Sequence, residues 1–253
     1  MKNTFEWPDG KRAAVSLSFD DARLSQVDRG LAILDRCGAR ATFYVSIASL
    51  DQRLDAWKQA VAAGHEIGNH TLNHPCSRNF PFARPKALED YTLERMEGEL
   101  LDANEAIRQR LGVAPTTFAY PCGQTFVGRG EQVRSYVPLV ARHFLAGRAA
   151  FNETHNHPAF CDLAQLFSRD GDARGLNELK AMVDTAADAG GWLILMGHEI
   201  GGETAAHQVT NAEALAGVCA YCQDPARGIW LDTVAAVGEY VRAQQQGVLA
   251  AGA

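Results

Sequence analysis

The 253-residue chain has few of the features that mark membrane, secreted or nucleic-acid-binding proteins. It contains no apolar run near the roughly 20 residues that a membrane-spanning helix needs. Its N-terminus, MKNTFEWPDGKR, lacks the apolar core of a secretion signal, so we expect a cytoplasmic protein. Its formal net charge of -6 argues against a partner bound through nucleic-acid phosphates.

Cysteine is also sparse, with six in the whole chain and no dense framework of the kind that staples small secreted domains. We therefore expect free thiols. Cys219 and Cys222 have CxxC spacing, but no second CxxC or cluster of histidines follows them. They lie in NAEALAGVCAYCQDP, which has a helical pattern, and we interpret them as structural because buried free cysteine packs as a small hydrophobe.

Short apolar runs alternate with helical patterns along the chain, without a low-complexity linker or a repeat. Such alternation predicts an α/β fold with parallel strands, as a doubly wound sheet or a barrel. The runs do not alternate between apolar and polar residues, which indicates strands buried on both faces. The longest helical pattern covers residues 86–111. The predicted strands are AAVSLSF, ATFYVSI, HEIGNH, TTFAYP, WLILMGH and IWLDTV, with another in LVARHFLAG.

Functional sites in parallel α/β folds form at the carboxyl ends of the strands. Residues that take part in chemistry should therefore follow apolar runs. Four polar clusters do so, namely Asp20–Asp21, His70 with His74, Tyr120–Gln124, and His198–Glu199.

The motif HTLNH places two imidazoles, His70 and His74, four residues apart. Two neutral imidazoles and one carboxylate form a 2-His-1-carboxylate site, which suits zinc, iron, cobalt or nickel and leaves positions open. Asp20 or Asp21 is the natural third ligand. The sequence therefore predicts a divalent metal site.

Adjacent side chains on a strand point to opposite faces, but at a strand end the backbone turns and both can reach one pocket. Asp20 and Asp21 can then divide the work: one binds the metal and the other accepts a proton from a water that the metal has made acidic. His198 ends a buried strand and can act as a general acid, because histidine titrates near neutral pH.

The motifs SFDD, HTLNH, FAYPCG and LILMGHE occur in this order. With them the chain resembles the polysaccharide deacetylases of carbohydrate esterase family 4, the nodulation-type chitooligosaccharide deacetylase homology domain, over roughly residues 12–240 of a single domain. The resemblance implies a distorted (β/α) barrel of about seven parallel strands. It also implies hydrolysis of N-acetyl or O-acetyl groups on sugar polymers with a bound divalent metal, often zinc.

The resemblance also implies individual roles. It makes Asp20 the catalytic base and His198 the catalytic acid. It makes Asp21, His70 and His74 the metal ligands. It makes the Cys122 N–H an oxyanion-hole donor, and it places Tyr120 and Leu195 in the substrate pocket, with Leu195 lining the space for the acetyl methyl group.

The chain departs from the family pattern at three places. Ala119 stands where the third motif usually carries an arginine, and Cys122 replaces the usual aromatic residue. No clear Asp–Trp pair matches the fourth motif, which orients the acidic histidine. For the missing arginine we take Arg142 as the candidate that orients the base, with Arg148 as the second choice.

Two alternative functions stay open. One is hydrolysis of a cyclic imide or ureide by the same fold, as in relatives that resemble allantoinases, with a small amide as the substrate. The other is a carbohydrate-binding barrel without catalysis. The sequence leaves open the sugar, the type of acetyl linkage, the choice among zinc, cobalt and nickel, and the oligomeric state.

Overall fold

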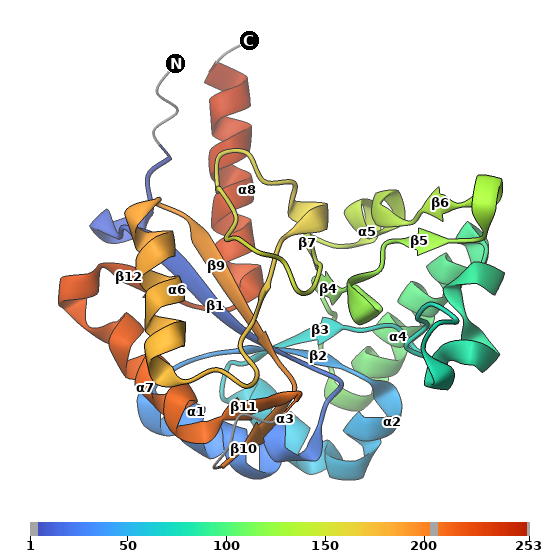
Figure 1. Ribbon diagram of the computed structural model, residues 1–253, viewed down its shortest axis with the longest axis horizontal. Coiled ribbons are helices and arrows are strands. Elements are labelled where there is room, and N and C mark those ends of the chain that lie inside the picture. The colour runs from blue at the N-terminus through green and yellow to red at the C-terminus, as the bar shows by residue number, and fades with distance from the viewer. Residues whose placement is uncertain (1–4, 203–206, 252–253) are drawn as a thin grey trace.

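A curled parallel β-sheet forms the centre of the molecule (Figure 1), and the computed structural model describes residues 5–202 and 207–251. Its strands are β1 (Ala13–Asp20), β2 (Thr42–Val45), β3 (Glu66–Asn69), β4 (Thr117–Ala119), β7 (Ala146–Arg148), β8 (Arg169–Asp170), β9 (Trp192–Gly197) and β12 (Ile229–Leu231). Seven of them follow the order β7-β4-β3-β2-β1-β9-β8, with every neighbouring pair parallel. β12 pairs in parallel with the first residues of β1. The predicted α/β barrel of about seven parallel strands is confirmed.

The two ends of this strand path lie close together. Arg148, the last residue of β7, forms an isolated parallel bridge with Leu166, just before β8. The bridge brings the end of β7 to the same rim as the ends of β1 and β9. Two short two-stranded sheets lie outside the path, β5 (Phe126–Val127) with β6 (Arg134–Ser135) and β10 (Glu199–Gly201) with β11 (Val209–Asn211).

The central strands are buried on both faces. Every residue of β1 and of β9 is buried, which explains why their sequences show no polar alternation. The aromatic side chains of Phe19 on β1 and Phe43 on β2 stack with ring centroids 5.6 Å apart. A core of this kind fixes where each strand ends, and therefore where the polar residues that follow it emerge.

Helices cover the sheet from several sides. In Figure 1, α6 and α7 lie at the left and α4 and α5 at the right, while α8 packs against β1 and β7. The helices are α1 (Leu31–Cys37), α2 (Ile47–Leu50), α3 (Leu54–Ala62), α4 (Leu93–Leu111), α5 (Val137–His143), α6 (Leu176–Asp188), α7 (Ala212–Gln223) and α8 (Val234–Ala251). None of these described helices has the length and apolarity to span a membrane.

Single helical turns occur in several loops, and one of them corrects a predicted boundary. The helix predicted over residues 86–111 begins only at Leu93, where the Thr92 side chain accepts a hydrogen bond from the Arg95 N–H and caps the first turn. The short turns are Pro8–Gly10, Gln26–Gly30, Asp51–Arg53, Pro81–Lys86, Leu88–Asp90, Pro121–Gly123, Gly130–Gln132, Leu163–Gln165 and Pro225–Arg227. The backbone is extended at Ala87, Tyr91 and Thr92, so residues 86–92 do not join the helix that follows.

Candidate active site

The four polar clusters that follow strands meet at one cleft of about 560 Å³. They come from the ends of β1, β3, β4 and β9, so the polar residues that follow these apolar strands lie together. The cleft contacts Asp20, Asp21, His70, His74, Cys122 and His198.

Asp20 and Asp21 both reach this cleft because the backbone turns sharply after β1. Asp20 is the last residue of the strand and is buried. Asp21 and Ala22 then adopt left-handed conformations, with φ of 74° and 52°. In a continued strand the two carboxylates would point to opposite faces, so this turn is what places them together.

Asp21, His70 and His74 form a three-donor set. The Asp21 Oδ1 atom lies 3.6 Å from His70 Nε2 and 3.5 Å from His74 Nε2. Donor atoms at about 2.0–2.2 Å from a tetrahedral zinc ion are roughly 3.3–3.6 Å apart. The spacing of the three donors therefore fits an ion of this kind, and the ligand atoms all lie within 4.8 Å of one another.

The hydrogen bonds of the two imidazoles favour metal binding. His70 Nδ1 donates to the Ala119 carbonyl at 2.8 Å. His74 Nδ1 lies 3.6 Å from the Cys76 sulfur, which is disulfide-bonded and has no hydrogen, so the ring is the donor. Both rings thus keep their Nε2 lone pair toward Asp21, the tautomer that metal-binding histidines need.

The electrostatics of the donor set shift the pKa values of His74 and Asp21 downward. Burial and the neighbouring His70 lower the pKa of His74 to about 4, so its ring is neutral near neutral pH. Burial by itself would raise the pKa of Asp21, but His70, His74 and Arg23 outweigh it and the pKa is lowered. Arg23 also donates to the second oxygen of Asp21, at 2.9 Å from Nη2.

Asp20 is paired with Arg148, and this corrects the choice of Arg142. Arg148 Nη2 donates to Asp20 Oδ1, and the Arg148 side chain is 0% exposed. Its Nη1 also donates to Ser168 Oγ at 3.2 Å. Arg142 instead lies on the surface, 63% exposed and 3.3 Å from Glu97. The arginine beside the candidate base is therefore our second choice, at the end of β7.

His198 has a buried carboxylate partner that the sequence reasoning missed. His198 Nδ1 lies 2.7 Å from Asp172 Oδ2, and Thr210 Oγ1 donates to Asp172 Oδ1 at 2.6 Å. Burial alone would lower the pKa of His198, but the hydrogen bond to Asp172 and the charge of Asp20 outweigh it and raise the pKa. Asp172 follows β8, which has two polar residues, so no apolar run in the sequence pointed to it.

The turn after β4 brings Tyr120 and Cys122 to the cleft. Tyr120 contacts the cleft, while its hydroxyl donates to the Ala164 carbonyl at 2.6 Å. Cys122 has a left-handed φ of 54°. Among the described residues we find no acceptor for the Cys122 N–H, whereas the next N–H, of Gly123, donates to the Tyr120 carbonyl. The Cys122 N–H therefore stays available to a bound oxyanion.

The prediction that Leu195 lines the pocket is wrong. The Leu195 side chain packs into the hydrophobic core beside residues of β1 and α6, such as Leu17 and Leu179. The next residue, Met196, contacts the cleft instead. Successive side chains on a strand point to opposite faces, so a shift of one residue exchanges the core face for the cleft face.

The prediction of six free thiols is also wrong for two cysteines. Cys76 and Cys122 form a disulfide between the loop after β3 and the turn after β4. Cys37, Cys161, Cys219 and Cys222 are free. Cys219 and Cys222 are buried in α7, as expected for structural residues.

Comparisons with known proteins agree with this arrangement. The sequence profile of the family described as polysaccharide deacetylase matches residues 8–137, just over half of the chain. A gellan lyase from a Bacillus species is 27% identical over 192 residues, which are 72% of this chain and 7% of that protein. The peptidoglycan-N-acetylglucosamine deacetylase PgdA of Listeria monocytogenes serotype 1/2a is 29% identical over 110 residues, 43% of this chain and 21% of that protein.

The fold has close counterparts among solved structures. A protein from Mycobacterium smegmatis, named as a candidate polysaccharide deacetylase, superposes with a TM-score of 0.70 at 20% identity. The match covers 95% of this chain and 94% of that one. The curated relatives are much longer, since the chain spans less than a third of the length of the gellan lyase and of the Listeria deacetylase.

Proposed function

Because the chain belongs to the polysaccharide deacetylase family, we propose that it is a metal-dependent hydrolase that removes N- or O-linked acetyl groups from a carbohydrate. The observation that carries the proposal is the convergence of a three-donor set, a buried carboxylate and a buried histidine on one cleft. These groups have separate tasks in the hydrolysis of an acetyl amide or ester.

Asp21, His70 and His74 would hold the ion, most simply zinc, with cobalt and nickel suited to the same donors. When bound, a divalent ion supplies positive charge that polarises a carbonyl and makes water more acidic. The two histidines bring rings with fixed tautomers, and Asp21 brings the negative charge. The donor set therefore directs two ring nitrogens and one carboxylate oxygen to a common point.

Asp20 is suited to act as the general base. It lies at the cleft beside Asp21, the residue proposed to hold the metal, and it is held by the buried Arg148. The ion pair fixes the carboxylate through Oδ1, which leaves Oδ2 to accept a proton from the attacking water. Arg148 is thus a positioning residue that acts through Asp20.

The other side of the cleft is suited to receive the developing charge and the leaving group. The Cys122 N–H can donate to the carbonyl oxygen as it becomes an oxyanion. His198 can give its proton to the leaving amine or alkoxide, because the Asp172 carboxylate favours the protonated ring. Asp172 therefore fills the role for which the sequence showed no Asp–Trp pair.

The mouth of the cleft supports a carbohydrate substrate. Phe80, Phe82 and Phe151 contact the cleft and are exposed. The rings of Phe80 and Phe82 lie 5.4 Å apart. Flat apolar surfaces of this kind suit the apolar face of a sugar ring beside the scissile acetyl group.

The direct test is an assay of acetate release from N-acetylglucosamine oligomers and from O-acetylated xylan, with cyclic imides assayed alongside for ring opening. The protein is stripped with a chelator and then restored with zinc, cobalt or nickel. We expect acetate release from a sugar that disappears with the metal and returns with it. Ring opening without acetate release would instead assign the imide or ureide reaction, and sugar binding without turnover would assign a binding barrel.

A further inference from the structure

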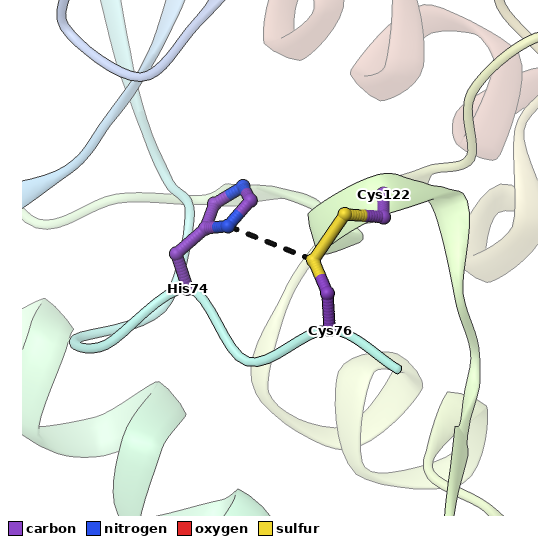
Figure 2. Close-up of side chains that lie close together, drawn as sticks. All are labelled: His74, Cys76 and Cys122. Atoms are coloured by element: carbon purple, nitrogen blue, oxygen red, sulfur yellow. Dashed lines mark hydrogen bonds between the residues drawn. A yellow bond between two sulfur atoms is a disulfide. The ribbon is translucent and has the colours of Figure 1, made fainter. Parts of the chain in front are cut away.

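The Cys76–Cys122 disulfide joins two loops that line the cleft (Figure 2). Cys76 lies two residues after His74, and Cys122 lies in the turn after β4, where its N–H has no acceptor among the described residues. Cys76 is fully buried, and Cys122 is partly exposed and contacts the cleft. The bond therefore connects the loop that carries His74 to the turn Tyr120–Gln124, across 46 residues of sequence. We call this turn the oxyanion turn, because the Cys122 N–H is the proposed oxyanion donor.

The disulfide also supports the His74 ring. Figure 2 shows Nδ1 of His74 directed at the Cys76 sulfur, and the two atoms lie 3.6 Å apart. The other histidine of the set is held more firmly, since His70 donates to a backbone carbonyl at 2.8 Å and its side chain is only 2% exposed. The His74 side chain is 27% exposed, so its orientation depends more on this sulfur contact.

The backbone around His74 is anchored on one side without the disulfide. The N–H of Asn73 and its side-chain amide both donate to Glu99, and the His74 N–H donates to Thr71 Oγ1. On the other side, the link to the oxyanion turn is the disulfide together with a hydrogen bond from the Ser77 N–H to Gln124 Oε1 at 2.7 Å. The disulfide is the covalent member of this pair of links.

We propose that the Cys76–Cys122 disulfide is a positioning element of this site. It directs the Nε2 lone pair of His74 toward Asp21, and it holds the turn that presents the Cys122 N–H. Without the bond, the protein binds its metal more weakly and turns over more slowly. The effect on turnover rests on the proposed hydrolase function, whereas the effect on metal affinity does not.

Substitution is a cleaner way to remove the bond than reduction. A water-soluble phosphine would cleave the disulfide to two thiols while water supplies the oxygen of the phosphine oxide. The freed Cys76 and Cys122 sulfurs would then lie with His74 in a second donor set, within 4.8 Å of one another, and could themselves bind zinc. The double variant Cys76→Ser with Cys122→Ser removes both the bond and these ligands.

The variants are compared by zinc affinity, measured on the metal-free protein in competition with a chromogenic chelator. We expect the double variant to bind zinc about 10–100-fold more weakly, the usual effect of losing a group that orients a metal ligand. Cys161→Ser is the matched control, because this free, partly buried cysteine is not among the residues that contact the cleft, and its affinity should equal that of the wild type. A changed absorption spectrum of the cobalt-loaded double variant would report the altered geometry at the ion directly.

Three results would overturn the proposal. One is a zinc affinity of the double variant within about twofold of the wild type, since loss of an orienting group should cost more. Another is six free thiols in the denatured, unreduced wild type, where the disulfide requires four. The third applies if the wild type hydrolyses acetyl groups, and it is a kcat of the double variant at saturating zinc that equals the kcat of the wild type. If circular dichroism shows that the double serine variant does not fold, the double alanine variant at the same two positions is measured instead. If the wild type shows no turnover, the zinc affinities of the wild type and the double variant can still be compared.

Discussion

The cleft has two halves that are built in different ways. The half proposed to supply the acid and the base consists of Asp20 with Arg148 and His198 with Asp172, and all four side chains are at most 10% exposed. The half proposed to hold the metal consists of Asp21, His70 and His74. It lies on loops with left-handed residues, and its Asp21 and His74 side chains are 18% and 27% exposed.

The difference follows from the cost of burying charge. In the acid–base half, each group that changes protonation has a partner of opposite charge supplied by the protein, since an unpaired buried charge is strongly destabilising. In the half proposed to hold the metal, two imidazoles face one carboxylate, and the other oxygen of that carboxylate accepts a hydrogen bond from the half-exposed Arg23. The protein thus completes the first half by itself and leaves room for an ion in the second.

The largest expected effects separate the two halves directly. Asp20→Asn should lower turnover by about 10²–10⁴, the usual contribution of a positioned base, and should retain zinc. Asp21→Asn should lose activity together with zinc, because it removes a ligand. Activity assays combined with metal analysis test this, and an Asp20→Asn protein that keeps full activity would refute the assignment of the base.

The next effect concerns stability. Arg148→Ala leaves the Asp20 carboxylate buried without its partner, so it should lower the free energy of unfolding by about 3–5 kcal/mol. Arg142→Ala, at a surface position beside Glu97, should change it by less than about 0.5 kcal/mol. Urea denaturation of both variants measures the contrast, and equal effects would contradict the placement of Arg148.

A smaller effect concerns pH. The pKa of His198 is raised by Asp172, and an acid must carry its proton, so activity should fall as the pH rises through the pKa of His198. In Asp172→Asn the stabilising charge is gone and the pKa of His198 drops, so this fall in activity should begin at lower pH. Profiles of kcat against pH for the wild type and Asp172→Asn test this shift. An alkaline limb at the wild-type position would show that His198 is not the acid.

The smallest effect extends the comparison to the rim of the cleft. Phe82 is 63% exposed and contacts the cleft, so Phe82→Ala should raise KM for an acetylated oligosaccharide about 2–10-fold, in line with one lost aromatic contact. Phe160 is 69% exposed and is not among the residues that contact the cleft, so Phe160→Ala is the control. A KM that rises equally in both variants would show that Phe82 does not contact the substrate.

The sequence predicted the strand ends well, but it did not predict the partners of the candidate catalytic residues well. Asp20, His70 and His198 could be placed at the ends of apolar runs because a strand ends locally, within a few residues. Asp172 follows a strand of two polar residues, which leaves no such signal. Leu195 was placed one residue out of register, which is enough to exchange the cleft for the core.

By itself, the sequence determined the order of the motifs, the alternation of strands and helices, and the spacing that brings two histidines to one loop. Only the tertiary structure decided which distant residues complete the site. Arg148 reaches Asp20 across 128 residues, Cys122 reaches Cys76 across 46, and Asp172 reaches His198 across 26. Short-range geometry depends on turns and strand ends, whereas Arg148 meets Asp20 because the sheet curls and brings the end of β7 to the rim where β1 ends. The other two contacts join segments that follow neighbouring strands, β3 with β4 and β8 with β9, and strand pairing is a property of the folded sheet.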